Sequence, residues 1–209
     1  MDFTLNKAQE MFRKSVEEFS RKELLPGVNE RAASTGFSHD IWKKVGQFGL
    51  TGLSIPEEFG GDGEGPVTTV TALIAIARAS GDSGLCVALA SHLLLTAMPI
   101  ADLGNAAQKK KYLPPMASGE KIGAFALTEP DAGSDATSMK TTAEKQDGYF
   151  TLNGSKTFIS NAPIADVFVV FASTAPGSKA GGISMFIVDR DTPGLTTGNA
   201  LEKYGNHDA

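Results

Sequence analysis

Apolar residues recur at intervals of three and four through the first 120 positions of the chain, which is the spacing of helices with one buried face. The pattern predicts helices over residues 6–25, from residue 38 to near Gly49, and from Pro66 to about Ser80. Their expected buried faces consist of Ala8, Met11, Phe12, Val16 and Phe19 in the first helix, Ile41, Trp42, Val45 and Phe48 in the second, and Val70, Leu73, Ile74 and Ala77 in the third. The N-terminal part of the chain is therefore predicted to be all-helical.

Polar residues mark where these helices should begin and end. Asn6 followed by Gln9 has the spacing of a capping box, and Ser38 is placed to cap the second helix. Asn105 would cap a short helix that we expect to end at the prolines at 114–115, because proline lacks the backbone donor that a helix interior requires.

Residues 85–101 are almost wholly apolar, and the exceptions are Ser91, His92, Thr96 and Pro99. A membrane-spanning helix needs about 20 apolar residues. This run is shorter and carries a histidine and a proline. We therefore expect a helix buried in the helical core and no membrane span.

After Gly119 the apolar period changes from 3.6 to 2. Strands are expected at residues 125–128, 149–152, 156–160, 167–172 and 183–188, and residues 139–146 alternate in polarity before a turn expected at Asp147 and Gly148. Asn153 and Gly154 separate two of them and have the composition of a two-residue hairpin turn. Helices followed by strands predict an α+β chain, with a helical domain over residues 1–121 and an antiparallel β-domain, barrel-like or sandwich-like, over residues 122–209.

One stretch, residues 125–135, concentrates polar groups at the end of the first predicted strand. Pro130 breaks the strand. Thr128 and Ser134 would then present their hydroxyls beside free backbone N–H groups, with Phe125 nearby. That setting suits a flat polar ring with acceptors along one edge. An ordinary turn between two strands explains the same residues, so the pattern alone leaves both interpretations open.

Four segments of the chain resemble, in the same order, segments of the acyl-CoA dehydrogenase family of flavoproteins. They are IPEEFGG at residues 55–61, QKKKYLPPMASGE at residues 108–120, LTEPDAGSD at residues 127–135 and LNGSKTFISN at residues 152–161. The resemblance covers essentially all of this chain but not all of the family's usual length. It implies FAD as the cofactor, held without a Rossmann fold, and no Gly-x-Gly-x-x-Gly in this sequence follows a strand and opens a helix.

The resemblance also implies which residues face the flavin. They are Phe125, Leu127, Thr128, Ser134, Phe158 and Ser160. Backbone amides and the Thr128 hydroxyl would reach the pyrimidine edge of the ring, and Ser134 would contact the cofactor or the substrate thioester. Phe158 and Ser160 would cover the ring from the predicted hairpin, where many family members carry tryptophan and threonine. The alternative for Phe158 is a core strand residue.

In the family, a glutamate removes the α-proton of an acyl-CoA and the β-hydrogen passes as hydride to flavin N5. That glutamate comes from a further helical domain, so we expect no catalytic base among these residues and do not assign the role to Glu129. Electron-transfer flavoprotein would be the electron acceptor. The alternatives are a truncated or split, non-catalytic module that binds FAD or acyl-CoA and needs a partner chain, and a same-fold oxidase or enoyl-CoA reductase.

The family buries its helical faces against further helices, so this chain would expose apolar surface without them. We therefore expect a homo-oligomer or a partner chain that carries the missing helical domain.

Composition and charge bear on the partners, disulfides, metal sites and location that the chain could have. The net charge is −5 and the longest basic run is residues 109–111, which argues against a nucleic-acid partner. A single cysteine, Cys86, excludes a disulfide within the chain. The histidines, His39, His92 and His207, have no metal-ligand spacing and are expected to be structural. The first six residues lack the features of a signal peptide, so we expect a cytoplasmic location.

Overall fold

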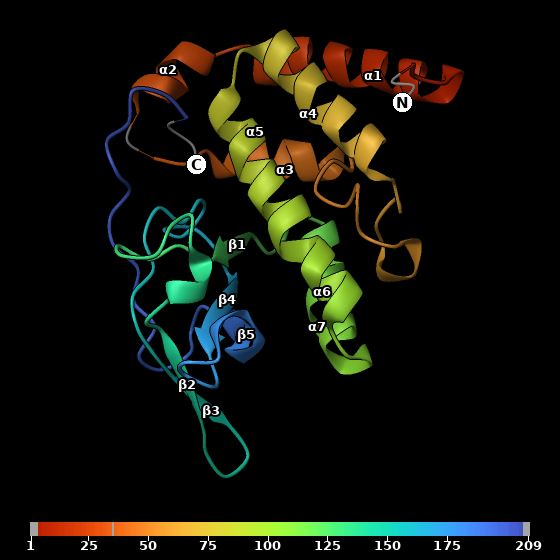
Figure 1. The fold of residues 1–209 in the computed structure, drawn as a ribbon. Coiled ribbons are helices and arrows are strands. Elements are labelled where there is room, and N and C mark those ends of the chain that lie inside the picture. Colours follow the sequence, from red (N-terminus) through yellow and green to blue (C-terminus); the bar gives the residue numbers. More distant parts are fainter. Residues whose placement is uncertain (1–3, 35, 207–209) are drawn as a thin grey trace.

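The computed structural model describes residues 4–34 and 36–206 of the chain. The stretch Met1-Asp2-Phe3 and His207, considered above, lie outside these residues. Figure 1 shows helices gathered in one part of the molecule and strands in another, so the predicted α+β class is confirmed. The helices are α1 (Lys7–Phe19), α2 (Val28–Ala33), α3 (His39–Gln47), α4 (Pro66–Ser80), α5 (Ser83–Ala90), α6 (Met98–Leu103) and α7 (Ala106–Ala117), with π-helical segments at Ser20–Leu24 and Ser91–Ala97 and 3-10 turns at Glu57–Phe59, Ala136–Ser138 and Lys179–Gly182.

The predicted helix starts are confirmed, because each depends only on hydrogen bonds between near neighbours. The Asn6 side chain accepts from the Gln9 N–H while the Gln9 side chain accepts from the Asn6 N–H. The Ser38 hydroxyl accepts from the Ile41 N–H at the start of α3. Asn105 forms a second capping box at the start of α7.

The predicted buried face of α1 is correct only in its second half. Phe12, Val16 and Phe19 pack in the helical core. Ala8 and Met11 are exposed, although Gln9 between them contacts Thr68 of α4.

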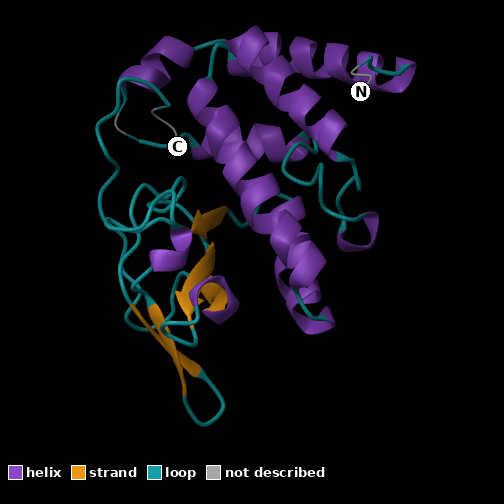
Figure 2. Ribbon diagram, in the orientation of Figure 1, coloured by secondary structure: helices purple, strands orange, loops and turns teal. Residues whose placement is uncertain are grey.

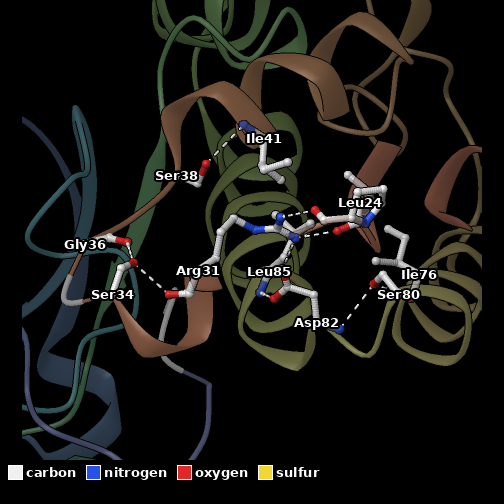
Figure 3. A network of polar contacts seen from close by, with 11 residues as sticks. Leu24, Arg31, Ser34, Gly36, Ser38, Ile41, Ile76, Ser80, Asp82 and Leu85 are labelled. Atoms are coloured by element: carbon white, nitrogen blue, oxygen red, sulfur yellow. Dashed lines mark hydrogen bonds and ion pairs between the residues drawn. The ribbon is translucent and has the colours of Figure 1, made fainter. Parts of the chain in front are cut away.

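Helix α2 was not predicted, and one arginine holds it in place. The Arg31 guanidinium donates to the carbonyl oxygens of Pro26 and Leu24 and pairs with the Asp82 carboxylate at 3.3 Å. Asp82 in turn accepts from the Leu85 N–H and caps α5. Figure 3 shows this network, which joins the end of the first helix, α2 and the start of α5. The sequence pattern carries no trace of the Arg31–Asp82 pair because these residues are 51 positions apart in the chain.

The predicted buried face of α4 is wrong for two of its four residues: Leu73 packs against the helical core and Ala77 is half-buried, but Val70 and Ile74 are exposed. Val70 and Ile74 are 44% and 51% exposed, and the buried face consists of Thr68, Thr69, Thr71, Ala72, Ala75, Ile76, Ala79 and Ser80. Small side chains let α4 approach its neighbours closely. The hydroxyls of Thr69 and Thr71 donate to carbonyl oxygens four residues earlier, so these threonines enter the core with their polar groups satisfied.

The apolar run at residues 85–101 lies inside one long helix, made of α5, the π-helical segment and α6, as expected. Ser83–Leu103 is long and apolar enough to cross a membrane, and 56% of its most apolar window is buried within the molecule. Leu85, Leu89 and Leu93 lie in the helical core. In Figure 1 this helix runs past the others to the level of the sheet.

Helix α7 does not end at the prolines at 114–115 but continues to Ala117. Tertiary packing outweighs the lost backbone donors, because Leu113 and Met116 are fully buried. Two side chains satisfy carbonyl oxygens at its C-terminal end: Thr51 donates to the Ala117 oxygen and Trp42 to the Gly119 oxygen.

The strands form one open, mixed sheet rather than the purely antiparallel domain that was predicted (Figure 2). They are β1 (Gly123–Ala126), β2 (Thr142–Lys145), β3 (Phe150–Asn153), β4 (Val167–Ser173) and β5 (Ile183–Asp189). β4 pairs in parallel with β1 and β2 and antiparallel with β5, while β2 and β3 form an antiparallel hairpin. β1 can pair in parallel with β4 because some forty residues separate them, long enough for the chain to cross over before it pairs.

Strand β4 is covered on both faces, as its continuous apolar sequence predicted. Val167 and Val169 pack in a cluster with Leu113 and Met116 of α7. Phe168 and Val170 pack in the cluster on the opposite face. The strand is therefore the central contact between the helices and the rest of the sheet.

Candidate functional site

The two segments predicted to share a site meet in the structure just beyond the end of β1. The Thr157 N–H donates to the Thr128 oxygen at 2.9 Å. The Lys156 ammonium donates to the Leu127 oxygen at 3.0 Å. Residues about thirty positions apart are thus held side by side.

The predicted hairpin at Asn153 and Gly154 is wrong. The hairpin of this region turns at Asp147 and Gly148, between β2 and β3, and residues 156–160 form no strand. Gly154 is required for a different reason: a Cβ there would lie 2.3 Å from the Thr141 Oγ1 atom. The chain passes against Thr141 at this point and then turns toward Thr128.

A buried ion pair fastens the two segments together. The Lys156 ammonium lies 2.8 Å from the Glu129 carboxylate, and both side chains are at least nine-tenths buried. Glu129 also accepts from the N–H groups of Lys140 and Thr141, at 2.6 and 3.0 Å, and from the Thr141 hydroxyl. Glu129 therefore joins the loop at residues 127–135 to the residues just before β2 as well as to residue 156.

This environment fixes the charge of Glu129. Burial alone would raise the pKa of this carboxyl, but hydrogen bonds from Lys156, Thr141 and the backbone outweigh it and lower the pKa to about 2. A carboxylate with so low a pKa and with both oxygens occupied is a poor proton acceptor. Glu129 acts as a structural anchor in this geometry.

Of the six residues predicted to face the flavin, some pack toward the interior and others lie at the surface. The Phe125 ring lies 5.1 Å from that of Phe171 and packs toward the helices. Leu127, Thr128 and Ser160 are half-buried, and Ser134 is exposed. The Thr157–Thr128 hydrogen bond places Thr128 beside the segment that carries Phe158 and Ser160, whereas Phe125 is linked to that segment only along its own strand.

Phe158 combines strong exposure with an unusual backbone. Its side chain is 77% exposed and its φ is +55°, a left-handed conformation that aromatic residues seldom adopt. Such strain persists only where the surroundings hold it, and it gathers at functional sites. A core strand role for Phe158 is thus excluded, and so is its predicted place on a hairpin strand.

Polar chemistry elsewhere in the described chain offers no competing centre. Among residues 4–34 and 36–206, no group of three or more His, Cys, Asp or Glu side chains could hold a metal ion. Cys86 is half-buried, and burial raises the pKa of its thiol to about 12. A hollow of about 500 Å³ is lined by α3 and by Ser118, Gly119, Glu120, Ile122, Ile164 and Asp166, and none of the six residues predicted to face the flavin is among its lining residues.

His92 is a structural histidine, as predicted. Its Nδ1 atom accepts from the Gly123 N–H, and its Nε2–H faces the oxygens of Thr51 and Met116 at 3.2 and 3.1 Å. Full burial lowers the pKa of His92 to about 4, although the two carbonyl oxygens favour the charged form.

We expect the free energy of unfolding to fall by about 3 kcal/mol as pH drops from 6.5 to 4 because of His92. The unfolded chain takes up the proton near pH 6.5, whereas the folded chain resists it until about pH 4. The contribution is therefore complete above pH 6.5. Urea unfolding at several pH values measures the slope, and the variant His92→Gln, which cannot titrate, should lack this component. A wild-type profile parallel to that of the variant would contradict the expectation.

Sequence reasoning missed two residues of this site, Lys156 and Asn161. Lys156 follows Gly154 by two positions, and nothing in the sequence pattern pairs it with Glu129. Asn161 has φ of +67° and is almost fully buried. Asparagine tolerates left-handed backbone, so its presence directly after Ser160 was the one signal available.

Comparison with known proteins gives a consistent result. Residues 6–120 match the family described as "Acyl-CoA dehydrogenase, N-terminal domain", and residues 124–209 match "Acyl-CoA dehydrogenase, middle domain". An acyl-CoA dehydrogenase of Bacillus subtilis is 45% identical over 197 residues, which are 94% of this chain and 52% of that protein.

Two solved structures share the fold along nearly the whole chain. Butyryl-CoA dehydrogenase from Megasphaera elsdenii has a TM-score of 0.91 and 39% identity, and the match covers 100% of this chain and 55% of that one. The FAD complex of PigA has a TM-score of 0.92 and 37% identity, with coverage of 97% and 53%. The chain thus spans about half the length of the proteins it matches.

Proposed function

The chain belongs to the acyl-CoA dehydrogenase family of FAD-dependent oxidoreductases, and we propose that its 209 residues form the part of such an enzyme that holds the flavin against an acyl-CoA thioester. The observation that carries this proposal is the meeting of the Thr128 and Phe158 segments, locked by the Thr157–Thr128 hydrogen bond and the Lys156–Glu129 pair. When bound, FAD supplies the hydride acceptor for α,β-dehydrogenation.

The residues present fit a flavin. A flat, hydrogen-bonding ring needs an apolar plate and donors at its edge. Phe158 offers an exposed plate held in a fixed backbone conformation. Thr128, Ser134 and Ser160 offer hydroxyl donors close to the surface. We call the surface formed by Thr128, Phe158 and Ser160 the flavin wall. We assign Leu127 and Phe125 to its support, and Ser134 to a contact with the cofactor or with the thioester of the substrate.

We propose a helical domain over residues 1–121, a β-domain over residues 122–209, and a catalytic base outside these 209 residues. About half of the length of the relative from Bacillus subtilis has no counterpart in these 209 residues. Both carboxylate oxygens of Glu129 accept hydrogen bonds, which supports its exclusion as the catalytic base. We also propose electron-transfer flavoprotein as the acceptor and the cytoplasm as the location, on the strength of the family resemblance.

A second candidate is a non-catalytic module that binds FAD or acyl-CoA and acts through a partner chain. The observation that favours it is the same half-length match to the relatives. A same-fold oxidase or enoyl-CoA reductase would use the same flavin wall and differ in its electron acceptor.

The exposed apolar face of α4 supports the expected assembly. Val67, Val70 and Ile74 lie at helical spacing on one face and are 55%, 44% and 51% exposed. Contiguous apolar surface of this kind marks interaction sites.

We expect the chain to self-associate, or to bind a partner that carries the missing helices, through this face of α4. Light scattering after size exclusion measures the mass. The double variant Val70→Asp, Ile74→Asp should shift the mass toward the monomer, whereas Leu201→Asp, on an exposed residue outside the helices and strands, should not. A monodisperse wild-type monomer with no partner would contradict the expectation.

The flavin assignment is tested by replacing Thr128 with valine. Loss of one hydrogen bond, worth about 1 kcal/mol, should weaken FAD binding about five- to tenfold. Titration of FAD fluorescence measures the dissociation constant. Thr151→Val, a change of the same kind on an exposed β3 residue, should leave it unaltered. Equal weakening by both variants, or by neither, would refute the assignment.

A further inference from the structure

Two buried side chains form hydrogen bonds with the backbone of one residue, Gly123. Its N–H donates to the His92 Nδ1 atom at 3.1 Å, and its oxygen accepts from the Asn161 Nδ2 atom at 2.9 Å. His92 and Asn161 are 0% and 1% exposed. Hydrogen bonds in such dry surroundings are strong and leave little freedom to the groups that make them.

Both side chains are also attached elsewhere. Asn161 Nδ2 donates to the Ala88 oxygen of α5 at 2.9 Å. His92 belongs to the π-helical segment of the long helix and reaches the oxygens of Thr51 and Met116. The long helix, β1 and the loop at residue 161 are therefore joined by one continuous chain of buried polar contacts.

The close approach of β1 to the long helix depends on the absence of a side chain at Gly123. A Cβ at this position would lie 2.7 Å from the Thr96 Cγ2 atom and 2.8 Å from the Met116 Cε atom. Thr96 and His92 both come from the π-helical segment. Single π-turns within α-helices are often found at functional positions, and here the segment presents both side chains to the start of β1.

The two ends of this link lead directly to the proposed flavin wall. Gly123 is the first residue of β1, and the chain continues from the end of this strand to Leu127 and Thr128. Asn161 follows Ser160 and is held in left-handed backbone at φ +67°, while its own oxygen accepts from the N–H groups of Ile164 and Ala165. Its Oδ1 atom is buried without a hydrogen-bond partner, so the amide is held in place by its donor contacts alone.

We infer that His92 and Asn161 are positioning residues, which set the distance between the Thr128 and Phe158 segments by binding the same glycine. The inference rests on the proposed function for the identity of the ligand, but the link itself is a property of these residues. A shift at Gly123 would displace Thr128, and a shift at Asn161 would displace Phe158. Because Gly123 is bound to His92, and Asn161 is bound to both Gly123 and Ala88, the long helix holds the Thr128 and Phe158 segments at a fixed separation.

The test replaces Asn161 with glycine, which removes the side-chain bonds and keeps the left-handed backbone free of strain. Asn206→Gly is the matched control, because Asn206 is also left-handed, at φ +54°, but is exposed. In the apo chain, amide hydrogen exchange at residues 123–128 and 157–160 should accelerate about tenfold in Asn161→Gly, while β4 and β5 stay protected. Unchanged exchange in either segment, or equal acceleration over the whole chain, would overturn the inference.

A flavin titration of the same variants separates this inference from the proposed function. If wild type binds FAD, Asn161→Gly should bind about tenfold more weakly and with an altered visible spectrum, and Asn206→Gly should match wild type. Identical affinity and spectrum in Asn161→Gly would overturn the inference and leave the proposed function intact. If wild type binds no FAD, the proposed function fails, and the exchange result alone decides whether the link positions the segments.

The second variant, His92→Gln, guards against a misfolded Asn161→Gly chain. Glutamine retains an acceptor for the Gly123 N–H but not the imidazole geometry. It should accelerate exchange at residues 123–128 more than at 157–160, since His92 contacts only the first segment. The reverse order would overturn the inference.

Discussion

Replacing Lys156 with methionine is expected to lower the free energy of unfolding by about 3 kcal/mol or more, because it strands the Glu129 carboxylate in the interior without its counter-charge. For a chain of this size the melting temperature should fall by at least about 6 °C. Urea and thermal unfolding at pH 7 measure both quantities. The flavin wall should loosen as well, since Lys156 also holds the Leu127 oxygen.

Lys140→Met provides the matched control. Lys140 pairs with Asp131 at 2.6 Å, but both side chains are largely exposed. Ion pairs of that kind contribute about 0 to 1 kcal/mol, so the control should unfold close to wild type. The double variant Glu129→Gln, Lys156→Met should recover part of the loss, because no unpaired charge stays buried. Equal effects at Lys140 and Lys156 would show that the buried pair is not the anchor we describe.

The second large expected effect is catalytic. The 209-residue chain by itself should fail to bleach FAD when an acyl-CoA is added without oxygen. Proton removal next to a thioester requires a placed base, and one general base contributes roughly 10²–10⁴-fold in rate. Glu129 is held at a pKa of about 2 by its hydrogen bonds, which leaves it unsuited to the role.

Absorbance of the flavin and appearance of enoyl-CoA are the two signals to follow. Bleaching that appears only when a second polypeptide with the remaining helical domain is supplied would support the split form of the enzyme. Clear bleaching by the chain alone would contradict the account, and Glu129 and Glu202 would then be the first carboxylates to replace.

Local chemistry explains what could be predicted from the sequence. The capping box predicted at Asn6 and the helix cap predicted at Asn105 are correct because each involves residues only three apart. The family segments located the Thr128 and Phe158 loops, and the structure brings them into contact. The continuous apolar run of β4 correctly indicated a strand with two covered faces.

Long-range packing explains what could not. The buried face of α4 includes threonines whose hydroxyls bond to backbone oxygens, so the hydrophobic pattern identified Leu73 but wrongly included Val70 and Ile74. Asn153 and Gly154 have the composition of a hairpin turn, but the contact of Gly154 with Thr141 requires a different path. The Lys156–Glu129 pair and the Gly123 link join residues that are tens of positions apart, and periodicity carries no information about such contacts.

The central claim is that the surface formed by Thr128 and Phe158 holds a flavin, and an equilibrium titration of the purified chain with FAD tests it most directly. We expect saturable quenching of flavin fluorescence with a change in the visible spectrum, at weak affinity. In Phe158→Ala the spectral change should be lost, and in Tyr149→Ala, an aromatic residue that is 64% exposed on the β2–β3 hairpin, it should persist. Absence of saturable binding to wild type, or an undiminished spectral change in Phe158→Ala, would contradict the account.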